Sequence, residues 1–167
     1  MIEIADLKKV YLLGKVEVAA LRGVSLTIGN GEFVGIMGPS GSGKSTLLHQ
    51  LGLLDTPSAG SIRIDGSDVS RLDDEDRTTF RLRHLGSVFQ DYALVSELNV
   101  LEKVAIPAIM QGRPLPECYA RAAQVLEKVG LKNRLGHLVY ELSGGEQQRV
   151  SIARALVNTP SILFADE

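Results

Sequence analysis

The chain has 167 residues, which is typical of one domain, and 44% of them are hydrophobic, enough to fill a sizeable core. Its 18 basic and 20 acidic side chains leave a net charge of −2, so bulk electrostatics give no reason to bind nucleic acid or anionic lipid. The single cysteine, Cys118, excludes an internal disulfide framework, and neither a membrane-spanning apolar run nor a signal peptide is seen, so we expect a cytoplasmic protein.

The N-terminal part of the chain is predicted to be rich in strands. Apolar and polar residues alternate over residues 2–4 and again over 24–28, which is the period of a half-buried strand. A glycine-containing turn at 29–31 leads into the apolar run 33–37, which we predict to be a buried strand. A further short strand is expected over residues 61–64.

A phosphate-loop motif follows the predicted strand. It fits the pattern G-x-x-x-x-G-K-[ST] without a mismatch, and apolar residues at helical spacing come next. We expect Lys44 to reach the β- and γ-phosphates of a nucleoside triphosphate, and the Ser45 hydroxyl to bind the Mg²⁺ that bridges them. The alternative, a Gly/Ser-rich surface turn, is disfavoured by the strand, the lysine and the helix. The predicted nucleotide-binding residues here are Gly38, Pro39, Ser40, Gly41, Ser42, Gly43, Lys44, Ser45 and Thr46.

The middle of the chain is predicted to be mostly helical. An S-x-x-D capping pattern at Ser70 predicts a charged helix that runs to about Arg83. A strand is expected over residues 86–90, where it ends in a loop. Helical patterns then dominate residues 99–159, with an interruption at 112–116. Cys118 falls in this helical part and is expected to be a buried apolar side chain rather than a reactive thiol.

A second candidate phosphate site begins at Ser143. Ser143 and Glu146 form an S-x-x-E capping box at the start of a predicted helix. The capping box does not explain Gly144 and Gly145, each of which costs a helix about 1 kcal/mol relative to alanine. Because two glycines leave the first N–H groups uncovered, an anion could sit directly on this helix end, and we interpret the segment as a second phosphate-binding site.

The last residues combine an apolar run with two carboxylates. Residues 161–165 have the form of a strand covered on both faces, and the carboxyl end of such a strand is where a doubly wound sheet places its ligand. We expect Asp166 to hold Mg²⁺, directly or through water, and Glu167 to polarise the water that attacks the γ-phosphate. The alternative is two solvated charges at a chain end, which the phosphate loop disfavours.

Together these motifs resemble those of the ABC-transporter ATPases. Residues 38–45 resemble the Walker A motif, 142–146 the family signature and 162–166 the Walker B motif, and the resemblance covers the whole chain. The chain is most similar to the bacterial lipoprotein-releasing and macrolide-export group. The resemblance implies an α/β fold: a P-loop NTPase core with a mostly parallel sheet, an N-terminal antiparallel β subdomain and a helical subdomain that carries the signature.

The same resemblance implies domain boundaries and further residue roles. It divides the chain into a β-rich and Walker A core (1–90), a helical subdomain (91–157) and the Walker B strand (158–167). Tyr11 is expected to stack on adenine, the alternative being a tyrosine packed on the core. Gln90 is expected to ligate Mg²⁺ and sense the γ-phosphate, the alternative being an ordinary loop glutamine.

The implied function is that of an ATP-hydrolysing motor subunit. It would bind ATP and Mg²⁺ and pair with a second copy, so that each nucleotide lies between one Walker A loop and the opposite signature helix. Its other partner would be an integral-membrane permease for export or extraction, on the inner face of the cell membrane, and no nucleic acid is expected. The alternatives are a soluble ABC-type ATPase, which would carry a tandem cassette or a coiled-coil insertion, and a module that binds nucleotide without turnover.

The family pattern continues past the Walker B strand, whereas this sequence stops at Glu167. A D-loop, a switch histidine and later strands would follow, and His49, His84 and His137 do not match that histidine. We therefore expect a C-terminally truncated cassette that exposes a sheet edge or an apolar face and hydrolyses ATP weakly or not at all.

Overall fold

The computed structural model describes residues 1–89 and 97–166. These residues form two compact units, Met1–Thr78 and Thr79–Glu167, each of which is described by itself. Two residues with predicted roles, Gln90 and Glu167, lie outside the described residues.

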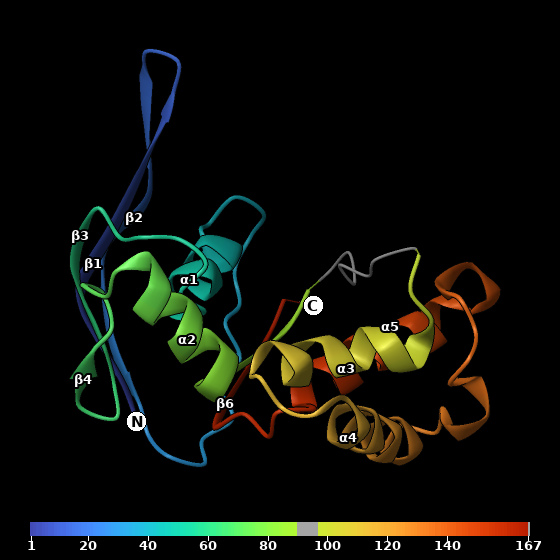
Figure 1. The fold of residues 1–167 in the computed structure, drawn as a ribbon. Helices are drawn as coiled ribbons and strands as arrows, with labels where there is room; N and C mark the ends of the chain where they lie inside the picture. The colour runs from blue at the N-terminus through green and yellow to red at the C-terminus, as the bar shows by residue number, and fades with distance from the viewer. Residues whose placement is uncertain (90–96, 167) are drawn as a thin grey trace. The chain divides into compact units, whose positions relative to one another are not determined.

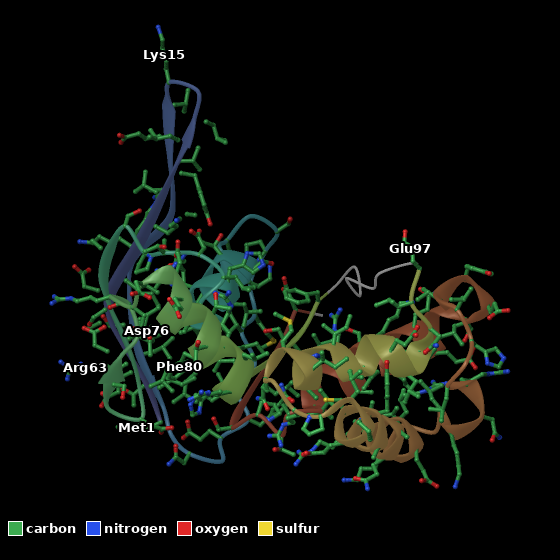
Figure 2. The ribbon with its side chains drawn as sticks, viewed as in Figure 1. Met1, Lys15, Arg63, Asp76, Phe80 and Glu97 are labelled. Atoms are coloured by element: carbon green, nitrogen blue, oxygen red, sulfur yellow. The ribbon has the colours of Figure 1, made fainter. Side chains whose placement is uncertain are left out.

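The first unit is built on an antiparallel sheet. Strands β1 (Ile2–Leu13) and β2 (Val16–Ile28) form a long hairpin, and Lys15 lies at its tip (Figures 1 and 2). Strands β3 (Ala59–Ile64) and β4 (Ser67–Asp68) extend the sheet to give the order β2-β1-β3-β4. This arrangement confirms the predicted antiparallel β part and the predicted strand over 61–64.

One face of this sheet carries the core of the first unit. Ile2 pairs with Ile28 on one side and with Ile64 on the other, and Ile4 pairs with Ile62. Helix α1 (Lys44–Leu51) also buries Leu47 and Leu51. The alternation in the sequence therefore predicted the buried face correctly, because successive strand residues point to opposite sides.

The prediction of a buried strand over residues 33–37 is wrong. These residues have no strand pairing, and the side chains of Phe33 and Met37 are 101% and 93% exposed. A strand is stable only when a neighbouring strand accepts and donates its backbone hydrogen bonds. Among the described residues of the first unit, no segment pairs with this run. The apolar run thus remains unpaired in this unit.

Helix α2 (Asp74–His84) begins four residues after the predicted capping serine. The carboxylate of Asp73 accepts a hydrogen bond of 2.8 Å from the backbone N–H of Asp76, which makes Asp73 the residue that caps the helix. Ser70 instead donates its hydroxyl to Asp68. The predicted start was wrong because Ser70 has this nearer carboxylate as a partner.

The second unit contains a parallel pair of strands. Strand β5 (Leu85–Val88) pairs with β6 (Ile162–Ala165), with Leu85 opposite Ile162 and Val88 opposite Ala165. The prediction that the last strand is covered on both faces is wrong, since its residues alternate between half-buried and exposed and Leu163 is 48% exposed. Among the described residues β6 pairs only with β5, so one of its edges and one of its faces remain open.

Three helices form the core of the second unit: α3 (Val100–Met110), α4 (Leu115–Lys128) and α5 (Gly144–Leu156) (Figure 1). Two short 3₁₀ turns, η1 (Lys132–Arg134) and η2 (Val139–Glu141), connect α4 to α5. Cys118 is buried in this core, as predicted. Across the described residues, no helix combines the length and the apolar character needed to cross a membrane.

One polar side chain ties three parts of this unit together. The amide Nδ2 of Asn158 donates to the carbonyls of Leu82 in α2 and Pro107 in α3, at 3.3 Å and 3.0 Å. Gln111 Nε2 also donates to the Leu82 carbonyl, at 2.9 Å. Carbonyls in the last turn of a helix have no partner within the helix, so these amides satisfy the end of α2.

Candidate functional site

The predicted phosphate loop leads into an uncapped helix end. Gly43 is the N-cap of α1 and has a left-handed backbone with φ of 94°, and no side chain caps the helix. No capping side chain therefore covers the end of α1 that a phosphate would approach. The Lys44 ammonium donates to the carbonyls of Gly38 and Pro39, both at 3.1 Å, so it lies against the loop rather than extending into solvent. The positive charge of Lys44 thus lies at a helix start that has no side-chain cap.

Two glycines of the loop lie close to other atoms, and one of these contacts requires a glycine. A Cβ on Gly38 would lie 2.9 Å from the Ser42 hydroxyl oxygen, and one on Gly43 would lie 2.6 Å from the carbonyl oxygen of Ala20 in β2. The second contact is with backbone, which cannot turn away as a side chain can. Gly43 therefore lets the loop pack directly against the β1–β2 hairpin.

Tyr11, the predicted adenine-stacking residue, lies beside the phosphate loop. Its hydroxyl donates to Asp55 Oδ2 at 2.9 Å and also forms a hydrogen bond with the side chain of Thr46. The Lys9 ammonium donates to Asp55 Oδ1 at 2.7 Å and lies 4.9 Å from the centre of the Tyr11 ring. The structure therefore brings Tyr11 and Thr46 together, as a shared base and phosphate site requires.

The charges in this cluster fix the protonation of both acidic groups. Partial burial raises the pKa of Tyr11, and the hydrogen bond to the Asp55 carboxylate raises it further, so the phenol stays neutral and donates. Burial would also raise the pKa of Asp55, but hydrogen bonds from Lys9 and Tyr11 outweigh that effect and hold it below its usual value. Asp55 is thus an ionised acceptor shared by two side chains.

The signature helix α5 has the capping box that the sequence predicted. Ser143 is the N-cap; its N–H donates to Glu146 Oε2 at 2.8 Å, and the Glu146 N–H donates back to the Ser143 hydroxyl oxygen at 3.4 Å. A Cβ on Gly144 would meet nothing within 4 Å, and one on Gly145 only the end of Arg149. The space around the first turn is therefore open to an anion.

Glu146 has a third partner, which sequence reasoning missed. Its Oε1 accepts a hydrogen bond of 3.0 Å from Arg134 Nε. Hydrogen bonds from the Ser143 backbone and hydroxyl, and then from Arg134, lower the pKa of Glu146 to about 2. The carboxylate is therefore ionised at any ordinary pH.

The remaining predicted site residues are distributed over the two units. Ser45 is the second residue of α1 in the first unit, whereas Asp166 follows β6 in the second. The Asp166 N–H donates to the Val88 carbonyl at 3.1 Å, which continues the pairing of β6 with β5. Asp166 is thus fixed at the carboxyl end of a parallel strand, the position predicted for a magnesium ligand.

A glycine loop with its lysine at an uncapped helix end, and a second glycine-rich helix start, are the features of an ATP-binding cassette. Residues 21–167 match the family model described as ABC transporter, so the chain belongs to the ATP-binding family of ABC transporters.

Similar proteins carry the names expected from the sequence. The chain is 50% identical over 167 residues to the macrolide export ATP-binding/permease protein MacB of Chlorobaculum tepidum, of which it covers 26%. It is 46% identical over 167 residues to the lipoprotein-releasing system ATP-binding protein LolD 1 of Rhodopirellula baltica, of which it covers 73%. All of this chain is covered in both comparisons. The predicted resemblance is confirmed, and the chain corresponds to part of each relative.

Solved structures confirm the predicted fold class. The dimeric structure of MJ0796, described as a bacterial ABC transporter cassette, matches with a TM-score of 0.93 and 43% identity, over 99% of this chain and 73% of that one. A structure of the same cassette in a post-hydrolysis state with ADP and Pi matches with a TM-score of 0.93 and 42% identity. The chain thus has the α/β fold of a P-loop NTPase cassette.

Proposed function

We propose that the chain binds ATP and Mg²⁺ and hydrolyses ATP to power export or extraction by a membrane permease. The observation that carries the proposal is the start of α1, where no side chain caps the helix and the Lys44 ammonium lies against the loop. The loop 38–46 binds the phosphates through its backbone N–H groups, of which Pro39 has none, and Lys44 contacts the β- and γ-phosphates. Tyr11 stacks on the adenine, which is supported by its hydrogen bond with Thr46.

The oxygen donors of this chain suit Mg²⁺, which prefers hydroxyl, carboxylate and amide oxygen ligands. Ser45, Gln90 and Asp166 would hold the ion, and the ion would neutralise charge on the β- and γ-phosphates. Glu167 would accept a proton from the attacking water as the general base. MacB and LolD, as their names state, serve macrolide export and lipoprotein release. These names support a role in export or extraction for this chain.

Hydrolysis in this proposal takes place in a dimer. Ser143, Gly144 and Gly145 bind the γ-phosphate of the nucleotide held by a second copy, and the capped start of α5 with its open first turn supports this role. The matching cassette MJ0796 was solved as a dimer, which supports such pairing. ATP then acts as the link between two copies, and the permease senses whether the link is present.

The test uses the full-length protein with Glu167→Gln, which removes the proposed general base and should slow hydrolysis so that ATP stays bound. ATP should convert this variant to a dimer in sedimentation, and adding Ser143→Arg should prevent dimer formation, because the arginine fills the phosphate position. Ser67→Arg, at an exposed position on β4, is the matched control and should leave the dimer intact. Equal dimer in the Ser143→Arg and control proteins would refute the role of the signature across the interface.

A further inference from the structure

The Glu146 carboxylate has two groups of partners, one on each oxygen. Oε2 accepts the N–H of Ser143 at 2.8 Å and its hydroxyl at 2.9 Å, while Oε1 accepts Arg134 Nε at 3.0 Å. Arg134 precedes Glu146 by 12 residues and ends the η1 turn. The guanidinium thus binds Oε1, the carboxylate oxygen that takes no part in the capping box.

The contact between Arg134 and Glu146 addresses an electrostatic problem in the proposed function. The start of α5 must accept a triphosphate, yet a carboxylate with a pKa of about 2 lies in its first turn. An ionised carboxylate repels phosphate. In addition, the Ser143 hydroxyl donates to Glu146, so it must turn away from Oε2 before it can donate to a phosphate oxygen.

We propose that Arg134 is a positioning residue for the signature helix: it neutralises Glu146 and holds Oε1, so that the Ser143 hydroxyl can leave Oε2 for the γ-phosphate while the carboxylate stays in place. The inference rests on the proposed function, since it assigns no role to Arg134 without a phosphate at α5. With Oε1 held, Oε2 continues to accept the Ser143 N–H, and the helix start keeps its shape.

The backbone around Arg134 is fixed well enough for this task. The Arg134 N–H donates to the Leu131 carbonyl at 2.9 Å, and the Arg134 carbonyl accepts the N–H of His137 at 3.0 Å. The His137 carbonyl in turn accepts the N–H of Val100, the first residue of α3, at 2.9 Å. The guanidinium NH1 lies 3.3 Å from the His137 ring nitrogen Nε2. The arginine is therefore anchored to α3 and directed toward α5.

The alternative is an ordinary surface ion pair, because the Arg134 side chain is 45% exposed and that of Glu146 18% exposed. Such pairs contribute little to stability. The same chain offers a matched example, since Arg121 Nε lies 3.0 Å from Glu117 on α4, with side chains 36% and 43% exposed. If Arg134 and Glu146 form only a surface ion pair, removing Arg134 should have as little effect as removing Arg121. If Arg134 is a positioning residue, its removal should have a larger effect.

The experiment is a double-mutant cycle in the full-length protein with Glu167→Gln. Sedimentation gives the ATP concentration at which half of the protein is dimeric. Arg134→Ala should raise it about 10-fold, as expected for loss of a charge-assisted hydrogen bond, and Arg134→Lys should restore part of the loss by restoring the charge. Arg121→Ala should change it less than about 2-fold, since an exposed helix pair is worth little. ATP affinity measured at protein concentrations below dimer formation should be unchanged in all of them, which also shows that each variant folds.

The decisive arm adds Glu146→Gln, which keeps a capping-box side chain but removes the negative charge. In that background Arg134→Ala should have an effect below about 2-fold, since no charge remains to neutralise. An undiminished effect there, or no effect of Arg134→Ala in the parent, would overturn the positioning role while leaving the proposed function intact. If ATP produced no dimer in the parent, the proposed function would fail and the inference with it.

Discussion

The two helices that begin with glycine-rich motifs, α1 and α5, differ in how their first turns are capped. Helix α1 begins after Gly43, which offers no side chain, and no other side chain caps it. Helix α5 begins after Ser143, whose hydroxyl and backbone are engaged in a reciprocal capping box with Glu146. Both ends carry the same partial positive charge from the helix dipole. They differ in what a phosphate must displace.

This difference indicates an order of events under the proposed function. At α1 no capping side chain has to be displaced by a phosphate, and the Lys44 ammonium needs to leave two loop carbonyls. At α5 the phosphate competes with Glu146 for the Ser143 hydroxyl. Nucleotide is therefore expected to bind first at α1, and α5 to join when a second copy supplies it.

The largest expected effect is that of Lys44→Ala at the uncapped helix end. Loss of a charge-assisted contact to two phosphates should weaken ATP binding by about 100-fold or more, which is beyond detection in ordinary calorimetry. Lys15→Ala at the hairpin tip (Figure 2) is the control and should bind ATP normally. Unchanged affinity in Lys44→Ala would remove the basis for a phosphate site at α1.

A pair of glycine substitutions tests whether the two helix ends differ in packing as well as in capping. Gly43→Ala should lower the free energy of unfolding by about 2 kcal/mol or more, because a Cβ would lie 2.6 Å from the Ala20 carbonyl at a φ of 94°. Gly144→Ala should leave it unchanged or raise it by up to about 1 kcal/mol, since nothing lies within 4 Å of the new atom. Urea denaturation measures both, and equal destabilisation would contradict the contrast.

A smaller effect is expected where Tyr11 meets the phosphate loop. Asp55→Asn removes the charge that holds Lys9 and Tyr11, so the ring is less well positioned and ATP affinity should fall about 3- to 10-fold, as for one or two ordinary hydrogen bonds. Asp68→Asn is a matched control in the same sheet unit, since its side chain is 31% exposed and that of Asp55 is 32% exposed. Fluorescence titration with an adenine nucleotide compares them, and equal affinities would exclude a role for Asp55.

The smallest effect concerns pH and the capped helix end. The folded pKa of Glu146 lies near 2, well below its ordinary value of 4.5. A lowered folded pKa stabilises the protein above the unfolded pKa, and that stability is lost as pH falls from about 4.5 toward 2. Urea unfolding should therefore show a steeper loss of stability below pH 5 in the parent than in Glu146→Gln. Parallel curves would show that the capping box contributes no pH dependence.

Local motifs were predictable from the sequence because their partners lie within a few residues. The phosphate loop and the Ser143–Glu146 box depend on residues three to eight positions apart, and both helix starts appear where the sequence placed them. Lys9 and Asp55 are separated by 46 positions, and Arg134 and Glu146 by 12. No periodicity or spacing rule connects such pairs, so these contacts were seen only in the structure.

The errors have related physical causes. Residues 33–37 have the composition of a buried strand, but composition does not supply the neighbour that a strand needs. The same holds for β6, where an apolar run predicted two covered faces and one is open. At α2, Ser70 was predicted to cap the helix, but its hydroxyl donates to Asp68, and the carboxylate of Asp73 caps the helix instead.

Asn158 has a mechanical consequence for the second unit. Its amide joins the last turn of α2, at Leu82, to the carbonyl of Pro107 inside α3, and it follows Val157, the C-cap of α5. Gln111 holds the same Leu82 carbonyl from the end of α3. A displacement of α3 is therefore transmitted to the segment that enters β5 by the hydrogen bonds of these two amides, which are short and directional. We therefore expect the helical core and strand β5 to move together.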